Sequence, residues 1–283
     1  MLTSRKKNIL QGAASGRLLV ALIFLVCAGF SALVHAATRS VEGLDIDAVV
    51  LRGSSEVLIE IGDETKLRVN GAEKELEKQP FYVRGSTLYL GYSESGKRAK
   101  SVKYKLIAES LESIKLEGSG TIYVKPMTTQ ELDVELEGSG DIRLYSITAD
   151  ELQVSVAGSG NLQLAESSVE SLLVQLAGSG DVDLGKVTSQ STEISMSGSG
   201  DIVASEEGSA VELEISLAGS GDIDIDSIQA QRVEVNIAGS GDIAVWAEQE
   251  LEVNILGSGD VTYRGDPDVD SSVMGSGDIS RSE

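Results

Sequence analysis

The sequence predicts an all-β protein, a β-solenoid in which each coil contains about 20 residues. The first observation is a tetrad, Gly-Ser-Gly-Asp or a one-letter variant, that occurs nine times at intervals of 18 to 21 residues. The second is a period of two between the tetrads, which is typical of strands with one buried face. A propeller is the alternative, but its blades need about 40 or more residues. The tetrads begin at Gly118, Gly138, Gly158, Gly178, Gly198, Gly219, Gly239, Gly257 and Gly275.

Residues 1–36 are predicted to be a secretory signal peptide. Arg5, Lys6 and Lys7 give a basic start, residues 18–34 are apolar or small, and Ala36 ends a suitable cleavage site. We therefore expect an exported chain that begins at Ala37 and lies in the periplasm, outer cell envelope or extracellular space, without stable membrane insertion. An uncleaved anchor is the alternative, since 17 apolar residues lie at the short limit of a membrane span.

Cleavage of this segment would remove the only cysteine, Cys27, and the only histidine, His35. The remaining chain would then have no thiol nucleophile, imidazole base, disulfide or cysteine and histidine metal ligand. It would also be strongly acidic, because loss of four of the 23 basic residues leaves 19 against 45 acidic ones, a formal charge of −26. This charge argues against nucleic acid as a partner. No cofactor is predicted.

Residues 37–110 are expected to form an irregular N-terminal β cap and the first coils. The segment is continuous with the regular coils of residues 111–283, so that residues 37–283 form a single domain. A charged stretch at residues 72–78 predicts one helical turn. Solenoids need their open ends covered, which gives this segment its expected role. The strands predicted here are 56–61, 65–70, 81–83, 87–90 and 102–107.

The regular repeats predict a core made of stacked identical layers. In residues 152–164, apolar or small residues recur at every second position, through both glycines of the tetrad. The same register recurs in the other coils, so we expect Val154, Val174 and Ile194 to share one core layer. Stretches such as 146–151 and 165–171 lack this pattern and are expected to be turns that close the coils.

The tetrads themselves are interpreted mainly as structural corners. A glycine inside a strand costs roughly 0.5–1 kcal/mol relative to alanine, so geometry must require so many of them. We expect the glycines to lie on the inward register where the backbone turns or two walls approach closely. The intervening serines would stack as a hydroxyl ladder on the other side. Representative corners are Gly158, Ser159 and Gly160, and Gly178, Ser179 and Gly180.

The fourth tetrad position allows a second interpretation, a cation site. Aspartate, asparagine and threonine occur there, and all are turn residues that can accept hydrogen bonds from backbone N–H groups. In a stack, the later copies would form a row of carboxylates, which we call the aspartate column: Asp181, Asp201, Asp222, Asp242, Asp260 and Asp278. Ca²⁺ usually takes six to eight oxygens from more than one carboxylate. The corner interpretation is favoured, so no metal is assigned.

The sequence resembles the putative auto-transporter adhesin, head GIN domain family (DUF2807). The resemblance covers about residues 42 to 280 and rests on the tetrads, on residues 49–71 and 85–92, and on a C-terminal signature at Tyr263, Gly265 and Pro267. It implies a right-handed, single-stranded parallel β-helix and a role in adhesion, and it brings no catalytic residues. Because only residues 279–283 follow the last tetrad, we do not expect the membrane barrel of an autotransporter.

Three function classes remain. The favoured one is a secreted, non-enzymatic binding or structural module of the cell envelope or surface, adhesin-like by resemblance. Its partner would be an envelope or surface protein or glycan, and end-to-end or side-by-side self-association is left open. An envelope regulator or assembly factor is the second class. A polysaccharide-active enzyme is the third, disfavoured by few aromatic residues and by the uniformity of the aspartate column.

Overall fold

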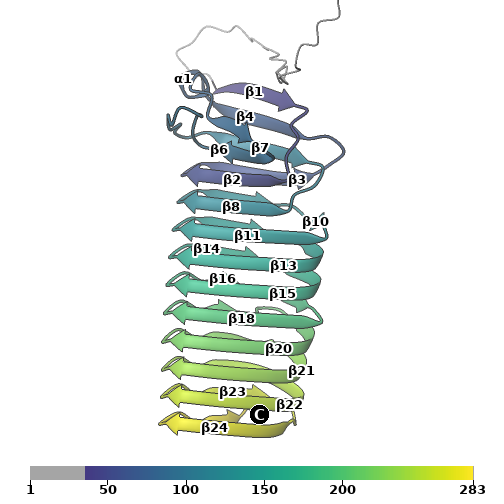
Figure 1. Ribbon diagram of the computed structural model, residues 1–283, viewed down its shortest axis with the longest axis vertical. Helices are drawn as coiled ribbons and strands as arrows, with labels where there is room; N and C mark the ends of the chain where they lie inside the picture. Colours follow the sequence, from purple (N-terminus) through teal and green to yellow (C-terminus); the bar gives the residue numbers. More distant parts are fainter. Residues whose placement is uncertain (1–35, 283) are drawn as a thin grey trace, which may run out of the picture.

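The computed structural model describes residues 36–282, which form one elongated β-solenoid of about eight turns. This confirms the fold class predicted from the sequence. Within these residues the structure has 25 strands and one short helix. Figure 1 shows the coils stacked in chain order from β2 to β24. The predicted signal peptide lies outside the described residues, and no helix among residues 36–282 is long and apolar enough to cross a membrane.

Two parallel sheets make up most of each coil. The long sheet contains β2 (Ala48–Gly53), β8 (Ser113–Gly118), β11 (Glu131–Gly138), β13 (Ile147–Gly158), β15 (Glu166–Gly178), β18 (Ser191–Gly198), β20 (Gly208–Gly219), β21 (Ile223–Gly239), β22 (Ile243–Gly257) and β24 (Asp268–Gly275). The short sheet contains β3 (Glu56–Ile61), β9 (Thr121–Val124), β12 (Asp141–Leu144), β14 (Asn161–Leu164), β16 (Val182–Asp183), β19 (Ile202–Val203), the starts of β21 and β22, β23 (Val261–Arg264) and β25 (Ile279–Arg281).

A third parallel ladder closes each coil on the side opposite the tetrads. It consists of β10 (Met127–Thr128), β17 (Lys186–Thr188), the first residues of β13, β15 and β20, and the middle residues of β21 and β22. The expectation that residues 146–151 and 165–171 are turns was therefore wrong. These residues close the coil as predicted, but they do so as strands, because stacking on the same segment of the next coil satisfies their backbone groups.

The core layers follow the period of two. Val174 of β15 lies in register between Val154 of β13 and Ile194 of β18, and all three side chains are fully buried. This confirms the predicted layer. The interior is a continuous column of aliphatic side chains between the two sheets. Since each coil contributes the same few positions, the stack grows by repeating one set of contacts.

The N-terminal end has a different topology, in which later strands cover earlier ones. The cap elements are β1 (Ala36–Glu42), β4 (Lys66–Ala72), α1 (Glu73–Leu76), β5 (Phe81–Arg84), β6 (Thr87–Leu90) and β7 (Lys103–Ala108). Strands β2 and β3 form the first coil, but β6 and β7 pair with their outer edges while β8 and β9 pair with their inner edges. Strand β4 then adds to β7, and β1 adds to β4, both antiparallel. All five strands predicted in this segment are present, with bounds that differ by at most two residues.

The tetrad glycines are required by the approach of neighbouring coils. The second glycine, such as Gly160, is buried, and a Cβ there would overlap the carbonyl oxygen of Gly140 in the preceding coil. The first glycine, such as Gly158, has a φ of +123° and a Cβ there would overlap the carbonyl of Gly138. Close packing therefore requires glycine at both positions, as predicted.

One part of the corner prediction was wrong. Gly158 does not lie on the inward register, because the positive φ turns the chain there and leaves this glycine exposed. The alternation resumes at Gly160, which does face the core. The serine between them contributes its backbone, since Ser159 donates its N–H to the Gly138 carbonyl at 2.9 Å and Ser179 donates to Gly158 at 2.8 Å.

Candidate functional site

The aspartate column has a specific hydrogen-bonding role in the structure. Each carboxylate from Asp181 to Asp260 accepts the backbone N–H of the aspartate one coil further on. The N to Oδ1 distances shorten along the stack, from 3.3 Å between Asp201 and Asp181 to 2.8 Å between Asp278 and Asp260. Asn161 fills the same role for Asp181, because its amide oxygen is an equivalent acceptor.

The ladder of side-chain acceptors replaces a backbone hydrogen bond that the earlier coils have. The N–H groups of Asp141 and Asn161 donate to the carbonyls of Gly120 and Gly140, each at 3.0 Å. From Asp181 onward the aspartate N–H instead donates to a side chain, and the short strand begins one residue later, at Val182 in that coil. Aspartate at this position therefore satisfies an N–H group that the turned backbone leaves without a carbonyl.

No group of three or more acidic, histidine or cysteine side chains that could hold a metal ion occurs among residues 36–282.

We expect Ca²⁺ to change the melting temperature no more than Mg²⁺ or NaCl at equal ionic strength, because the repulsion between neighbouring carboxylates about 4.8 Å apart needs only screening. Thermal melts in the three salts measure this. Asp222→Asn is the matched control, since it keeps an acceptor oxygen and removes one charge. A large shift specific to Ca²⁺ that Asp222→Asn abolishes would instead establish a cation site.

The C-terminal signature positions the last turn of the solenoid. Tyr263 lies on β23 and packs partly buried against the core. Gly265 has a φ of +96°, and a Cβ there would overlap the Ala247 carbonyl of the preceding coil. Pro267 directly precedes β24. These three residues form a tight connection from the short sheet to the long sheet.

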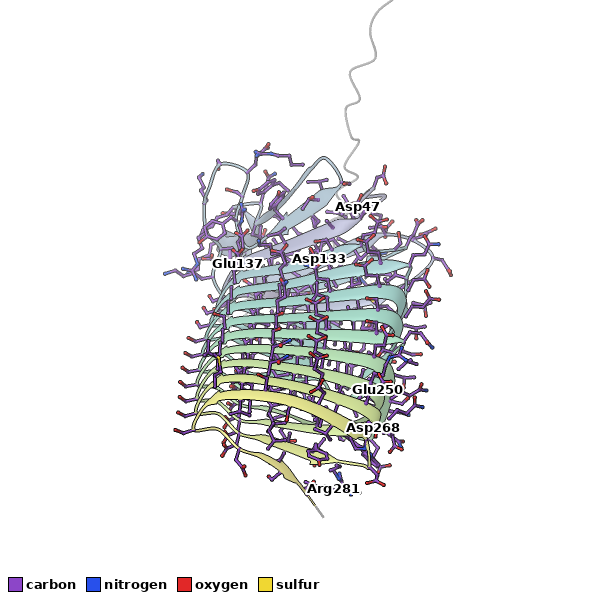
Figure 2. The ribbon with its side chains drawn as sticks, turned by 60° about the horizontal axis from the view of Figure 1, so that its bottom comes forward. Asp47, Asp133, Glu137, Glu250, Asp268 and Arg281 are labelled. Carbon is purple, nitrogen blue, oxygen red and sulfur yellow. The ribbon has the colours of Figure 1, made fainter. Side chains whose placement is uncertain are left out.

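The outer face of the long sheet is charged in the first coils. Lys115 bonds Glu135 at 2.6 Å and Glu137 at 2.8 Å. Although partial burial lowers the pKa of Lys115, the hydrogen bonds to these two carboxylates raise it overall. Burial, together with repulsion from Glu135, raises the pKa of the neighbouring Asp133, whose buried Oδ1 lacks a protein hydrogen-bond partner. Figure 2 shows Asp133 and Glu137 among the outward side chains of these coils.

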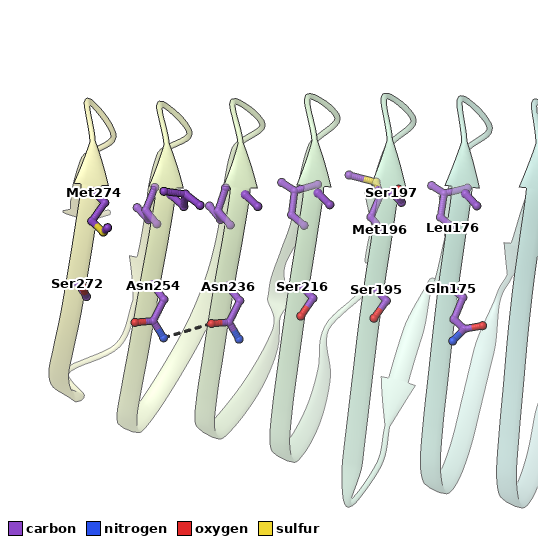
Figure 3. Close-up of a pocket in the computed structure, with 17 residues that line it drawn as sticks. Gln175, Leu176, Ser195, Met196, Ser197, Ser216, Asn236, Asn254, Ser272 and Met274 are labelled. Atoms are coloured by element: carbon purple, nitrogen blue, oxygen red, sulfur yellow. Dashed lines mark hydrogen bonds between the residues drawn. The ribbon is translucent and has the colours of Figure 1, made fainter.

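Further along the stack, the same face loses its charge. A shallow groove of about 730 Å³ runs across the long sheet beside the tetrad corners, over six coils (Figure 3). Two outward positions of each strand line it. One row carries polar, uncharged side chains, namely Gln175, Ser195, Ser216, Asn236, Asn254 and Ser272. The other row carries small or apolar side chains, namely Ala177, Ser197, Ala218, Ala238, Leu256 and Met274.

Apolar side chains are exposed at the C-terminal part of the groove. Leu256 is 60% exposed and Met274 is 63% exposed, and they are two of the few large hydrophobic side chains on the described surface. The amide of Asn254 donates to the side-chain oxygen of Asn236 at 3.2 Å, which fixes one pair in the polar row. A row of glutamates borders the groove one position further from the corner, with Glu214, Glu234 and Glu252 aligned in register.

The sequence analysis did not identify this groove, because it used the outward positions only to establish the period of two. A signal was present in the sequence. Outward residues are mostly charged in a chain with 45 acidic residues, yet the last two outward positions before each tetrad are uncharged from the third tetrad to the ninth. These positions run from Ser155 and Ala157 to Ser272 and Met274. An uncharged stripe on an acidic surface indicates a place where another molecule can approach without desolvating carboxylates.

The family model of the putative auto-transporter adhesin, head GIN domain (DUF2807), matches residues 45–206 and 202–267. These matches cover more than half of the chain. The protein belongs to this family. The resemblance noted from the tetrads and the C-terminal signature is thus confirmed. A comparison with curated proteins gave no match.

Solved structures with similar folds come from Parabacteroides and Bacteroides species. A putative lipid binding protein from Parabacteroides distasonis is 27% identical, with a TM-score of 0.68, over 88% of this chain and 97% of that one. A putative adhesin from Parabacteroides merdae is 20% identical, with a TM-score of 0.69, over 88% and 96% of the two chains. A putative adhesin from Bacteroides fragilis is 22% identical, with a TM-score of 0.55, over 89% and 100%. The last two similarities establish the fold alone.

Proposed function

We propose that this family member is an exported, non-enzymatic binding module that holds an uncharged surface of an envelope or cell-surface protein on the groove of the long sheet. The observation that carries the proposal is the groove itself, an uncharged surface over six coils of a strongly acidic chain. The signal-like residues 1–36 support export. The family description as an adhesin supports a binding role.

The shape and composition of the groove favour a protein partner over a sugar. Protein interfaces are depleted of charge at their centre and enriched in methionine and aromatic residues. The groove has that depletion, with the exposed Met274 at one end and serine and asparagine side chains that can exchange hydrogen bonds. Among its lining residues none is aromatic, so no ring is available to stack on a sugar. The bordering glutamates, such as Glu234, would repel acidic surfaces and restrict the partners that fit.

A lipid is the second candidate. The exposed Leu256 and Met274 give the groove an apolar end, and the similar structure from Parabacteroides distasonis is described as a putative lipid binding protein. Ligand pockets usually bury most of a small molecule's surface. A shallow groove on one sheet would cover only one side of an acyl chain, which favours the flat protein surface instead.

The absence of a catalytic role is part of the proposal and rests on the aspartate column. From Asp181 to Asp260, each member accepts the backbone N–H of the next aspartate, so within the column no pair of carboxylates differs from the others. An acid and a base would need different environments to separate their pKa values. The alternative role, an envelope regulator or assembly factor, would use the same binding surface.

We expect the double variant Ala218→Glu and Ala238→Glu to bind purified cell envelopes at least tenfold more weakly than the unmodified protein. Two carboxylates in the small-residue row would have to be desolvated on binding. Adsorption of the exported protein to envelopes of its own cells measures the effect. The binding should change little between low and high salt, because uncharged surfaces are not screened.

The matched control is Gln163→Glu, which adds a carboxylate to an exposed position of the short sheet. It should bind like the unmodified protein. Equal binding by the groove variant and this control would refute the proposed site. Protease treatment of the envelopes distinguishes the candidates, since it should abolish binding to a protein partner and leave binding to a lipid intact. A fluorescent long-chain fatty acid that binds the unmodified protein but not the groove variant would favour the lipid.

A further inference from the structure

The last coil leaves an open edge and an exposed core layer. Strand β24 pairs with β22, and β25 pairs with β23, and neither has a partner on its other side among residues 36–282. The inward positions of β24 continue buried layers, since Val269 follows Leu251 and Val273 follows Ile255. Both valines are nevertheless 42% exposed. The end of the solenoid therefore presents unpaired backbone groups together with apolar side chains. Figure 2 brings this end forward, with Asp268 of β24 and Arg281 of β25 labelled.

At the opposite end of the molecule β1 is also an edge strand, since β4 is its one partner among residues 36–282, but the core there is covered. Helix α1 packs against β1 and β4, and Leu76 in it is completely buried. Arg39 on β1 donates to the Leu76 carbonyl at 2.8 Å and pairs with Glu73 at 3.2 Å, which holds the helix over the end. The two ends are thus unlike, and the N-terminal end presents no exposed core layer for the C-terminal coil to cover. Figure 1 shows α1 and β1 at one end of the stack and β24 at the other.

We propose that two copies of this protein associate through their last coils, with β24 of one copy antiparallel to β24 of the other. A two-fold axis relates the copies, so each supplies the same surface and the assembly closes as a dimer. Added strands satisfy the open backbone groups of both copies. The α1 ends then point outward, and in the described part of the chain they expose no large hydrophobic side chain that a further copy could cover.

The sequence of β24 fits one register of this pairing. In an antiparallel pair, directly opposite residues point to the same side, so inward residues must face inward residues. With Ser271 on the two-fold axis, Val269 of one copy faces Val273 of the other and the core layer becomes continuous. On the outer face, Asp270 then faces Ser272, and Asp268 faces Met274. No carboxylate faces another.

The neighbouring registers are less favourable. Centring the pair on Asp270 would place that aspartate opposite its own copy, and like charges directly opposite destabilise a sheet. Centring it on Ser272 would place Val269 opposite Gly275, which has no side chain to cover it. Shifts by one residue would set inward side chains against outward ones. The register centred on Ser271 alone pairs the valines and separates the charges.

A covalent test uses the absence of cysteine in residues 28–283. Full-length protein that carries Cys27→Ser and Ser271→Cys is produced in an exporting host and oxidised mildly. Opposite residues on an antiparallel pair have Cα atoms about 4.5–5.5 Å apart, within disulfide range. We expect most of the protein to form a disulfide-linked dimer. Cys27→Ser with Ser199→Cys, an exposed corner position, should stay monomeric. Equal cross-linking of the two variants would overturn the proposal.

A second test disrupts the interface without touching the groove. Sedimentation velocity of the unmodified protein should show twice the mass of the single chain. Val273→Lys should return it to the single mass, because two ammonium groups would be buried at the pairing edge. Val203→Lys is the control, since Val203 is 37% exposed on the side of the stack. A single mass for the unmodified protein, or a dimer that Val273→Lys leaves intact, would overturn the proposal.

Discussion

Replacing Val174 by aspartate should open the solenoid locally and lower its stability by about 4–5 kcal/mol or more, the largest class of single-residue effect. Val174 is fully buried between Val154 and Ile194, and only aliphatic layers surround it. A carboxylate there has no partner, so it must either stay neutral or unfold its neighbours to reach water. Hydrogen exchange of the amides in β13, β15 and β18 should show lost protection centred on this coil.

The matched control is Gln175→Asp, on the next residue of the same strand. Gln175 is exposed on the outer face, and its neighbours in the adjacent coils, Ser155 and Ser195, are uncharged. The new carboxylate is therefore solvated, and the change in stability should stay within about 0.5 kcal/mol. Equal loss of protection in the two variants would contradict the assignment of Val174 to the core.

The regular coils could be predicted from sequence because each one repeats a local pattern. A period of two fixes which side chains face inward, and a constant repeat length fixes which residues stack, so Val154, Val174 and Ile194 follow without any knowledge of distant contacts. The corners followed as well, because glycine costs stability in a strand unless geometry requires it.

The order of the N-terminal strands could not be predicted in the same way. Strand β6 pairs with β2 across about 40 residues, and no repeat indicates which strand lies beside which. The first corner, Gly53, Ser54 and Ser55, is also altered, with serine in place of the second glycine. In the structure it stacks directly on the Gly118 corner. The sequence of the first coil therefore contains a corner motif, but one altered enough that it was not recognised as a tetrad.

The candidate site was harder to predict than the fold. The aspartate column was correctly expected to accept backbone hydrogen bonds, yet the sequence could not show that the side chains replace a carbonyl from Asp181 onward. That change depends on small differences in how the corner turns. The groove depends on outward residues, which a folding pattern does not constrain, so only their shared lack of charge could have indicated it.

Gly200→Ala should destabilise the protein by about 3–5 kcal/mol, although it adds only one methyl group. Overpacking against backbone atoms is one of the few mechanisms by which a single substitution has so large an effect. Gly200 is buried, and a Cβ there would overlap the carbonyl oxygen of Gly180 in the preceding coil. Backbone atoms cannot rotate away as a side chain can, so the coils must separate. Urea unfolding and hydrogen exchange in β18 and β20 measure the loss.

Two further glycines separate close approach from backbone strain. Gly96 has a φ of +81° and open space where a Cβ would lie, so Gly96→Ala carries only the strain of a left-handed conformation, about 1–2 kcal/mol. Gly198 has both features, since its φ is +143° and a Cβ there would overlap the Gly178 carbonyl. Gly198→Ala should therefore cause the largest loss of stability of the three glycine substitutions. Ser199→Ala, between them, keeps the backbone N–H that bonds Gly178 and should be nearly neutral. If Gly200→Ala lost no more stability than Gly96→Ala, the coils would have room at the corner, and close approach would not explain why both tetrad glycines recur.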